Sequence, residues 1–429
     1  MLFSALEIHL GEVFVGILFK YGDIIRLEVD RAYAGDMNRP TLSLSLKAED
    51  PAQEEALLRD PLNPSLNSLG KGKLPAFFQN LLPEGVLRKA VAAERKCAED
   101  DHFELLAACG LDLPGFVYAR PSNDRSVTAR ILTKGAESLE MSVVDEPMDD
   151  GVSISGMQPK LALVYEGGRY VSGRRHKGGH IIGKLPTALY DLLPEVEHLS
   201  LELARAAGVN ACETSLEPLD LIDADHHFTL GHSRTFLAVK RFDRDRPGRM
   251  HAEDFAQVLS IDPEMKYSGA TYGDIGRVLM RLEGLGEAAV LELFRRIAVS
   301  ELLGNYDFHV KNIGLLHFPD GRVELSPAYD IVAYSVYFAG RGHALAFGRG
   351  HAKKQILSPD TLRIFANEVG LPEPKLRQVV MQVCDRAFHV WPGLIDASTL
   401  MPEQKERLKK FVTSRDAMQS YMKRFRHGG

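Results

Sequence analysis

The residues best suited to chemistry stand together in one short polar stretch. Six consecutive positions hold four different polar side chains, namely Asp307, His309, Lys311 and Asn312. Asp307 and Asn312 are five positions apart. Catalysts of phosphoryl transfer use this D-x-x-x-x-N spacing to place a carboxylate at the acceptor hydroxyl and an amide oxygen on a magnesium ion. An Asp and an Asn at this spacing also occur by chance in polar loops, so the surrounding elements must decide between the two interpretations.

A second carboxylate is needed to hold such a cation from the other side. Asp330 stands where it is expected, and the residues before it predict a β-hairpin of strands 312–317 and 323–325. The hairpin carries Asn312 and Asp330 at its two ends, so both can converge on one ion. One carboxylate and one amide oxygen suit Mg²⁺, which takes its other ligands from water and phosphate. Asp307 would orient and deprotonate the acceptor hydroxyl, a step typically worth roughly 10²–10⁴ in rate.

The complete run is far more specific than the Asp–Asn spacing. It reads N-x-D-x-H-x-K-N over 305–312 and P-x-Y-D over 327–330. This run resembles the HipA family of bacterial serine/threonine kinases, the toxin halves of HipBA-type modules. The resemblance implies ATP- and Mg²⁺-dependent phosphorylation of a protein, and family members act on translation proteins such as aminoacyl-tRNA synthetases. It also implies that His309 faces the γ-phosphate. Lys311 either does so too or is simply solvated.

Two upstream segments are expected to contact the nucleotide phosphates. The small-residue run 151–160 precedes an apolar strand, 161–165, and resembles the S-x-x-G-x-Q-x-K nucleotide loop of the family. The residues assigned to this loop are Ser153, Ser155, Gly156, Met157, Gln158 and Lys160. Without the resemblance, an ordinary hairpin turn explains the run equally well. Strand 180–184 ends in Lys184, which fits the kinase strand lysine that pairs with the α- and β-phosphates.

A helix and a hinge complete the predicted nucleotide site. Glu197 opens the predicted helix 198–207, and the resemblance makes it a possible ion-pair partner of Lys184. An acidic residue in a first helical turn is also favourable to the helix dipole alone. The hinge after strand 236–240 is expected to contact adenine through Val239, Lys240 and Phe242. The charged run 241–244 resembles the R-F-D-R of the family and is predicted to be mainly structural, knitting the lobe junction.

Hydrophobic periodicity indicates an α+β chain. Alternation predicts strands over 13–19, 25–29 and 42–46, and helices are predicted over 87–96, 101–109, 253–260, 273–283, 286–303, 359–369, 374–390 and 403–424. The resemblance implies a protein-kinase-like two-lobed fold of the HipA type. It consists of a small β-rich N-terminal module, a nucleotide-binding lobe and a mainly helical C-terminal lobe. We divide the chain into an N-terminal subdomain (1–120), a nucleotide-binding part (121–245) and a helical catalytic lobe (246–429).

Composition excludes several classes of protein. The 429 residues are 45% apolar and 26% charged, as in an ordinary globular protein of two or three domains. No run of about 18 apolar residues exists, so no membrane span is expected. The first residues lack the basic and apolar segments of a secretion signal. Four scattered cysteines without a C-x-x-C pair argue against zinc and for a reducing environment, so we expect a cytoplasmic protein.

The expected partners follow from charge and from the resemblance. A formal net charge of −6 and the lack of a helix-turn-helix pattern argue against broad nucleic-acid binding by this chain. The resemblance implies a small HipB-like helix-turn-helix antitoxin that makes the operator DNA contacts. It also implies self-inactivation, because phosphorylation of the serine three residues before the loop glycine ejects the nucleotide loop in the family. Ser153 has this position relative to Gly156, with Ser155 as a competing acceptor. Alternatively, both serines only hydrogen-bond the turn.

Two other functions are compatible with these residues. Aminoglycoside kinases share the D-x-x-x-x-N logic, so the chain could phosphorylate a small molecule. A non-catalytic co-repressor subunit that acts by binding its antitoxin is the second alternative, and it predicts that ATP turnover is dispensable. The intact set of Asp307, Asn312, Asp330 and Lys184 argues against an inactive kinase.

Overall fold

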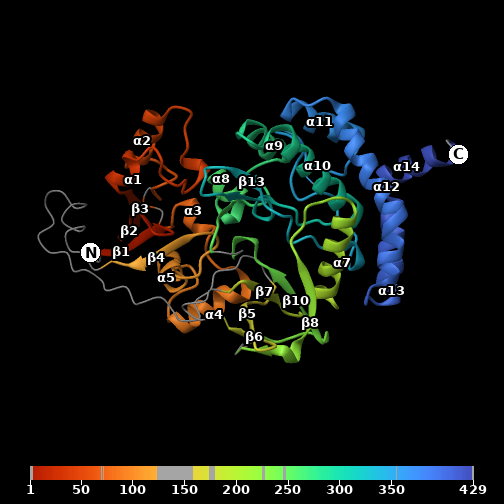
Figure 1. Ribbon diagram of the computed structural model, residues 1–429, viewed down its shortest axis with the longest axis horizontal. Coiled ribbons are helices and arrows are strands. Elements are labelled where there is room, and N and C mark those ends of the chain that lie inside the picture. The colour runs from red at the N-terminus through yellow and green to blue at the C-terminus, as the bar shows by residue number, and fades with distance from the viewer. Residues whose placement is uncertain are drawn as a thin grey trace, which may run out of the picture.

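The computed structural model describes residues 3–68, 70, 72–122, 158–172, 179–224, 228–244, 248–353 and 355–427. Figure 1 shows an α+β protein with three regions. A module in red and orange lies on the left, a mostly antiparallel sheet lies at the lower centre, and helices fill the top and right. The predicted α+β class is confirmed. The division of the chain after residues 120 and 245 stays a prediction.

The N-terminal module is built on an antiparallel sheet with the order β3-β2-β1-β4. Its strands are β1 (Phe3–Leu10), β2 (Val13–Tyr21), β3 (Ile24–Val29) and β4 (Val117–Pro121). Its helices are α1 (Arg31–Gly35), α2 (Pro51–Arg59), α3 (Ala76–Gln79), α4 (Gly85–Arg95) and α5 (His102–Ala108). Apolar residues of β1, α3 and α5 share one core, which includes Leu6, Phe78 and Leu105. The module therefore has a core of its own.

The predicted strand over 42–46 is wrong. Residues Leu44–Leu46 form a short 3₁₀ turn, and the Ser43 side chain caps it by accepting from the Ser45 N–H group. The Ser43 hydroxyl also donates to Glu253 Oε2 at 2.7 Å. The alternating leucines and serines thus form a turn that contacts Glu253, and in the described structure they pair with no strand.

The nucleotide-binding lobe is a six-stranded sheet with the order β8-β10-β7-β5-β6-β9. Its strands are β5 (Lys160–Glu166), β6 (Arg169–Ser172), β7 (Ile181–Lys184), β8 (Thr214–Pro218), β9 (Ile222–Asp223) and β10 (Thr235–Lys240). Helix α7 (Leu193–Ala206) packs against β10. The helix begins four residues before Glu197, with Pro194 in its first turn, so the predicted start was wrong. Glu197 lies in the helix interior, where the dipole explanation no longer applies.

The helical lobe surrounds α10 (Gly286–Leu303), which packs against α9 (Tyr272–Arg281) and α12 (Glu373–Ala397). The remaining helices are α8 (Phe255–Val258), α11 (Pro359–Val369), α13 (Pro402–Ser414) and α14 (Asp416–His427). A small antiparallel sheet joins β11 (His251–Asp254), β12 (Gly314–His317) and β13 (Val323–Leu325). Strands β12 and β13 are the predicted hairpin.

Two predicted helices of this lobe need correction. Residues 251–254 form strand β11 because they pair with β12, which leaves only Phe255–Val258 helical. The single helix predicted over 403–424 is two helices, with Arg415 extended between them. Arg415 Nε donates to the buried Glu301 at 2.7 Å. The change of direction places this guanidinium against a carboxylate that burial would otherwise destabilise.

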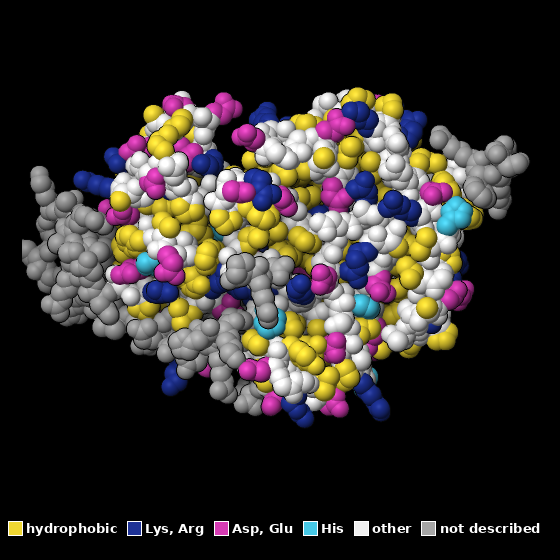
Figure 2. All heavy atoms as spheres, in the orientation of Figure 1, with side chains coloured by type: hydrophobic (Ala, Val, Ile, Leu, Met, Phe, Trp, Pro, Cys, Tyr) yellow, Lys and Arg dark blue, Asp and Glu magenta, His cyan; other side chains and the backbone are white. Residues whose placement is uncertain are grey.

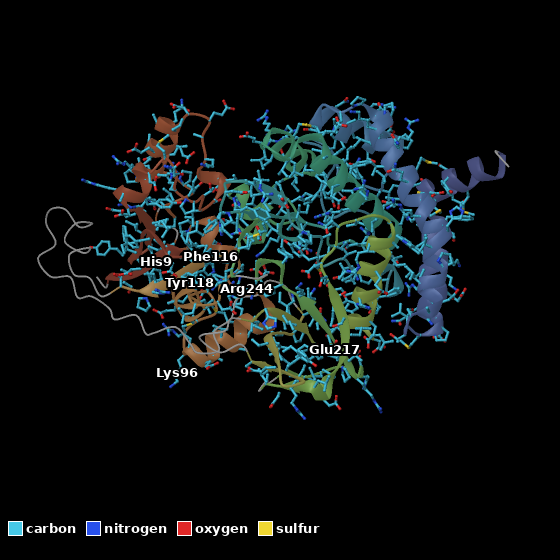
Figure 3. The ribbon with its side chains drawn as sticks, in the orientation of Figure 1. His9, Lys96, Phe116, Tyr118, Glu217 and Arg244 are labelled. Carbon is cyan, nitrogen blue, oxygen red and sulfur yellow. The ribbon has the colours of Figure 1, made fainter. Side chains whose placement is uncertain are left out.

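The run 241–244 has a structural role, but it joins the N-terminal module to the nucleotide-binding lobe, whereas the prediction placed it at the junction of the two lobes. Asp243 Oδ2 accepts the Gly115 N–H group at 2.9 Å, and Arg244 donates to the Gly115 carbonyl at 2.8 Å. Burial raises the pKa of Asp243, but Arg241 and Arg244 outweigh it and hold that pKa well below its ordinary value. Gly115 has φ +67° and lies so close to Ala252 that a side chain would collide with its backbone. Figure 3 shows Arg244 at this boundary, near Phe116 and Tyr118.

The face of the molecule shown in Figure 2 mixes basic and acidic side chains, and neither sign gathers into a patch of its own. That mixture disfavours broad electrostatic binding of nucleic acid by this face. No helix in the described part of the chain is long and apolar enough to cross a membrane.

A second contact between module and lobe contains a buried histidine pair. His251 Nε2 lies 2.8 Å from the Leu42 carbonyl oxygen, and the rings of His251 and His317 are 5.0 Å apart. His317 Nε2 lies 2.8 Å from Glu253 Oε1. Burial, together with His317, lowers the pKa of His251 to about 4. The contact is therefore built for a neutral His251.

We predict that acid weakens the fold through His251. The unfolded imidazole is protonated below its ordinary pKa of 6.5, whereas the folded one is protonated only near 4. The contribution of His251 to the free energy of unfolding is thus fully present above pH 6.5 and is lost as the pH falls toward 4. Between pH 7 and pH 5 this group removes about 2 kcal/mol of unfolding free energy. Urea unfolding of wild type and His251→Gln at both pH values measures the difference, with the surface variant His389→Gln as control. An equal loss in His251→Gln contradicts the assignment.

Candidate active site

The predicted catalytic loop, residues 305–312 and called the catalytic loop below, begins where α10 ends. Gly304 closes the helix with a left-handed φ of 66°, and the Asn305 N–H group returns to the Ser300 carbonyl at 2.9 Å. Asn312 Nδ2 donates to the Asp307 carbonyl at 2.8 Å. The five-residue spacing therefore has a physical cause, because the amide closes the loop on the backbone of Asp307. It also fixes the amide so that Oδ1 is the atom of Asn312 turned toward other ligands.

Alternate apolar residues anchor this loop and present the polar ones. Phe308 and Val310 are buried, and the Tyr272 hydroxyl donates to the Phe308 carbonyl at 2.9 Å. The Asp307 side chain remains 37% exposed. The buried residues thus fix the loop and leave the Asp307 carboxylate at the surface. A side chain that contacts an incoming substrate needs this exposure.

His309 lies beneath Asp307 and is buried. Its Nε2 atom is 3.7 Å from Asp307 Oδ1, and its Nδ1 atom has no hydrogen-bond partner among the described residues. Burial lowers the pKa of His309 to about 4, and Asp307 only partly opposes this. His309 is neutral at pH 7, so it offers the site a dipole and no positive charge. Its predicted contact with the γ-phosphate stays a prediction.

Three charged side chains that are distant in the sequence come together at the end of strand β7. Lys184 at the end of β7 donates to Glu197 of α7 and to Asp330. Burial lowers the pKa of Lys184, but the two carboxylates outweigh it and raise that pKa above its ordinary value. Burial raises the pKa of Glu197, whereas Lys184 and Lys160 overcome burial at Asp330 and lower its pKa. Lys184 lowers the pKa of both carboxylates, but burial and the neighbouring Asp330 charge outweigh it at Glu197, so Asp330 is the firmly ionised member.

Asp330 adopts an uncommon backbone conformation. Its φ is 53°, in the left-handed region that a residue with a side chain seldom adopts. Such positions cost free energy and gather at functional sites. The conformation turns the carboxylate back toward Lys184 after the hairpin, so Asp330 is held by both backbone and charge.

The two lysines predicted to contact the nucleotide lie side by side. Lys160 on β5 is the antiparallel register partner of Lys184 on β7, so both side chains leave the same face of the sheet. Burial lowers the pKa of Lys160, which also senses Asp330, Glu197 and Glu84. Gln158 Nε2 donates to the Leu185 carbonyl at 2.9 Å and ties the start of β5 to the end of β7. Ser153, Ser155, Gly156 and Met157 lie outside the described residues.

The predicted hinge contacts lie at the end of β10. Val239 is buried in the sheet, and the side chain of Phe242 packs on Tyr329 with ring centroids 5.6 Å apart. The Lys240 N–H group donates to the Glu213 carbonyl at 3.0 Å. The Lys240 N–H group is therefore already engaged, and the assignment of Val239, Lys240 and Phe242 to an adenine contact stays a prediction.

Sequence patterns did not reveal one contributor to the site, Glu84 of the N-terminal module. Lys311 Nζ lies 2.6 Å from Glu84 Oε1, and Lys266 Nζ lies 3.4 Å from Glu84 Oε2. The Lys311 side chain is 1% exposed, so the hypothesis of a solvated lysine is wrong. Glu84 lies in the run L-L-P-E-G at 81–85. No period or spacing in the sequence connects this glutamate with Lys311, which is 227 residues away.

The donor set for a cation is small. Within the described ranges, no group of three or more His, Cys, Asp or Glu side chains could hold a metal ion. Asn312 and Asp330 offer one amide and one carboxylate, a set too weak for a structural metal. It suits Mg²⁺ that arrives with phosphate oxygens and water.

Comparisons with known proteins agree on one family. A model described as HipA N-terminal domain matches residues 6–120, and one described as HipA-like C-terminal domain matches residues 152–391. A Sinorhizobium fredii protein named "Putative kinase Y4dM" is 35% identical over 84% of this chain and 85% of its own length. The Shewanella oneidensis serine/threonine-protein kinase toxin HipA is 28% identical over 65% of this chain and 67% of its own length.

A solved structure confirms the predicted fold. The HipA chain in the Shewanella oneidensis complex of HipA, HipB and operator DNA is similar with a TM-score of 0.69. The match covers 98% of this chain and 97% of that chain at 21% sequence identity. The kinase-like two-lobed fold, with its additional N-terminal module, is therefore the fold of this protein.

We predict that Glu84 and Lys311 stabilise the protein as a coupled pair. Glu84→Gln leaves Lys311 buried without the Glu84 carboxylate, and Lys311→Met leaves Glu84 without the shorter of its two lysine contacts. Each variant should therefore destabilise by a few kcal/mol, and the double variant by less than their sum. Unfolding free energies of the four proteins should give a coupling of about 1–3 kcal/mol. Lys73 and Glu264 form an exposed pair across the same boundary, and the equivalent cycle there should give at most about 1 kcal/mol. Equal couplings in the two cycles contradict the prediction.

Proposed function

The chain belongs to the HipA family, and we propose that it is an ATP- and Mg²⁺-dependent kinase that phosphorylates serine or threonine in a protein. One observation carries the proposal. Lys184 donates to both Glu197 and Asp330, which supports their assignment as strand lysine, helix glutamate and metal aspartate, because a kinase needs the lysine–glutamate ion pair with the metal aspartate close by. The Asp307 loop lies beside this group, because the hydroxyl of Tyr329, the residue before Asp330, donates to the Lys311 carbonyl of that loop at 2.8 Å.

Phosphoryl transfer needs alignment and charge neutralisation more than covalent chemistry. Asp307 accepts the proton of the acceptor hydroxyl while the oxygen of that hydroxyl bonds to the γ-phosphorus. The bond from that phosphorus to the bridging oxygen breaks, and ADP leaves with the bond electrons. Lys184 and Lys160 offset the charge of the phosphates from one face of the sheet. A bound Mg²⁺ supplies further positive charge, and Asn312 Oδ1 and the Asp330 carboxylate are the atoms that would hold it.

The surface beside Asp307 favours a protein acceptor. Tyr306 packs on Phe338 with centroids 5.8 Å apart, and Tyr190 lies 6.4 Å from the same ring. Next to Tyr190, the Leu189 side chain is 84% exposed. A small polar substrate gains nothing from exposed apolar side chains, whereas a protein segment can bury them. We assign the acceptor to the translation machinery, with aminoacyl-tRNA synthetases first, because family members act there.

Self-inactivation through the nucleotide loop belongs to the same proposal. Phosphate on Ser153 or Ser155 adds about −1.5 to −2 charges where the ATP phosphates arrive. That charge repels the nucleotide and favours an open loop. The support is the family resemblance of the loop and the position of its C-terminal end, since Gln158 contacts the Leu185 carbonyl and Lys160 pairs with Lys184 in the sheet.

We also propose a HipB-like helix-turn-helix antitoxin as the stable partner. The similar Shewanella oneidensis structure is a complex of HipA, HipB and operator DNA. This chain has a formal net charge of −6, so the antitoxin is the better source of DNA contacts.

We predict that Asp307→Asn lowers phosphotransfer by roughly 10²–10⁴ while ATP affinity stays the same. The amide keeps the size of the carboxylate but cannot accept the proton. Calorimetry with ATP, with and without Mg²⁺, measures binding. Phosphoproteomics of cells that produce each variant measures transfer, including transfer to Ser153 and Ser155. The matched control is Asp320→Asn on the exposed hairpin turn. Near-normal turnover in Asp307→Asn would refute its role, and products confined to sugars or amino alcohols would favour a small-molecule kinase.

We predict further that the purified chain alone shows no tight, sequence-specific DNA binding. Its operator affinity should arise only when the antitoxin is present, and it should fall steeply with salt because phosphate contacts dominate. Gel-shift titrations of the chain, the antitoxin and their mixture on the promoter DNA of the gene pair separate the contributions. Specific nanomolar binding by the chain alone contradicts this division of labour.

A further inference from the structure

We propose that Tyr267 is a gate on the catalytic carboxylate: its phenol occupies the place of the acceptor hydroxyl on Asp307, and the N-terminal module holds it there. The inference rests on the proposed role of Asp307 as the base. Its basis is one contact, in which the Tyr267 hydroxyl donates to Asp307 Oδ1 at 2.5 Å. A serine or threonine hydroxyl must make the same hydrogen bond in order to lose its proton.

The phenol is held from two further sides. The rings of Tyr267 and His309 meet edge to face with centroids 4.9 Å apart, and Lys266 Nζ lies 5.5 Å from the Tyr267 ring centre. Burial, together with the negative charge of Asp307, raises the pKa of Tyr267, so the phenol keeps its proton and donates a hydrogen bond to the carboxylate. Tyr267 is still 42% exposed, so a substrate can reach it and displace it.

The segment that carries Tyr267 is fixed by the N-terminal module and not by the catalytic lobe alone. Gln79 Nε2 donates to Asp262 Oδ1 at 3.1 Å, and Asn80 Nδ2 donates to the Ile261 carbonyl at 2.8 Å. Further along, Lys73 pairs with Glu264 at 2.9 Å and Glu84 pairs with Lys266 at 3.4 Å. Four module side chains thus anchor residues 261–266, directly before the tyrosine.

The competition has a simple consequence for kinetics. The Tyr267 hydroxyl and the acceptor hydroxyl are both donors to the same oxygen, so they exclude each other. Binding of a protein acceptor must first break a hydrogen bond to an ionised group. Without the phenol, acceptor affinity should rise about tenfold, the factor expected for one such bond. The phenol lowers the affinity of every hydroxyl acceptor by the same factor, so the gate weakens acceptor binding as a whole.

The test compares wild type, Tyr267→Phe and a matched control. The control is Tyr421→Phe, because the Tyr421 hydroxyl donates to Asp385 Oδ1 at the same 2.5 Å, far from the site on α14 and α12. With dephosphorylated casein as acceptor, Tyr267→Phe should lower the KM for casein about tenfold and leave the KM for ATP unchanged. Lys266→Met, which loosens the segment from Glu84, should act in the same direction by a smaller factor. Tyr421→Phe should match wild type.

Two outcomes overturn the gate. A lower kcat with unchanged casein KM in Tyr267→Phe means that the tyrosine orients Asp307 for catalysis. Phosphate on Tyr267 itself, found by mass spectrometry after incubation with ATP and Mg²⁺, makes the phenol an acceptor and not a placeholder.

A second measurement does not depend on kinase activity. 3-Fluorotyrosine placed at position 267 reports its surroundings through its ¹⁹F shift, which should move in the Asp307→Asn background and stay unchanged in the Asp385→Asn background. If casein is never phosphorylated but this shift responds, the proposed function fails while the contact stands. A shift that ignores Asp307→Asn shows that the contact is absent and refutes the gate whatever the enzyme does.

Discussion

The ion group of Lys184, Glu197 and Asp330 constrains the rest of the structure. A buried charge is tolerated only where a partner compensates it, and here one lysine serves two carboxylates. Its three members come from a strand, a helix and the end of a hairpin, so sheet, helix and catalytic lobe cannot move apart without exposing an uncompensated charge. Lys160, opposite Lys184 in the sheet, restores the balance of two positive and two negative groups. The residues proposed to handle phosphate are therefore also the ones that hold the two lobes together.

The N-terminal module follows the same rule at three places. Asp243 and Arg244 meet the backbone of Gly115, Glu253 meets Ser43, and Glu84 meets Lys311. Each contact joins charge to a complementary polar group within a largely buried boundary. Two of these contacts end at or beside the catalytic loop, at Lys311 and at Glu253. Docking of the module therefore affects the geometry of the loop. The candidate active site therefore includes contacts from the N-terminal module as well as from the rest of the chain.

Local features were predictable from sequence because their causes are local. Helix α10 was predicted with the bounds Gly286–Leu303 because its apolar period and its closing Gly304 are both written in neighbouring residues. The catalytic hairpin was predicted for the same reason. Failures occurred where a distant partner decides. Residues 251–254 are a strand because β12 lies beside them, and Ser43 is a turn residue because Glu253 accepts its hydroxyl. Glu84 and Tyr267 escaped notice because no period or spacing links them to Asp307 or Lys311.

Lys311 shows why the module cannot be a passive addition. A lysine whose side chain is almost wholly buried needs a carboxylate, and Glu84 provides it from 227 residues away. Without residues 1–120, the Lys311 side chain would either be exposed to water or be buried without the Glu84 carboxylate. Lys266 would lose its contact with Glu84 as well. The segment leading to Tyr267 would also lose the anchors at Asp262 and Ile261. A kinase of this fold that lacks the module must therefore rebuild the surroundings of its catalytic loop, with another carboxylate in place of Glu84 or another residue in place of Lys311. The N-terminal module therefore supplies the carboxylate that compensates Lys311 and, in the proposed mechanism, controls access to Asp307.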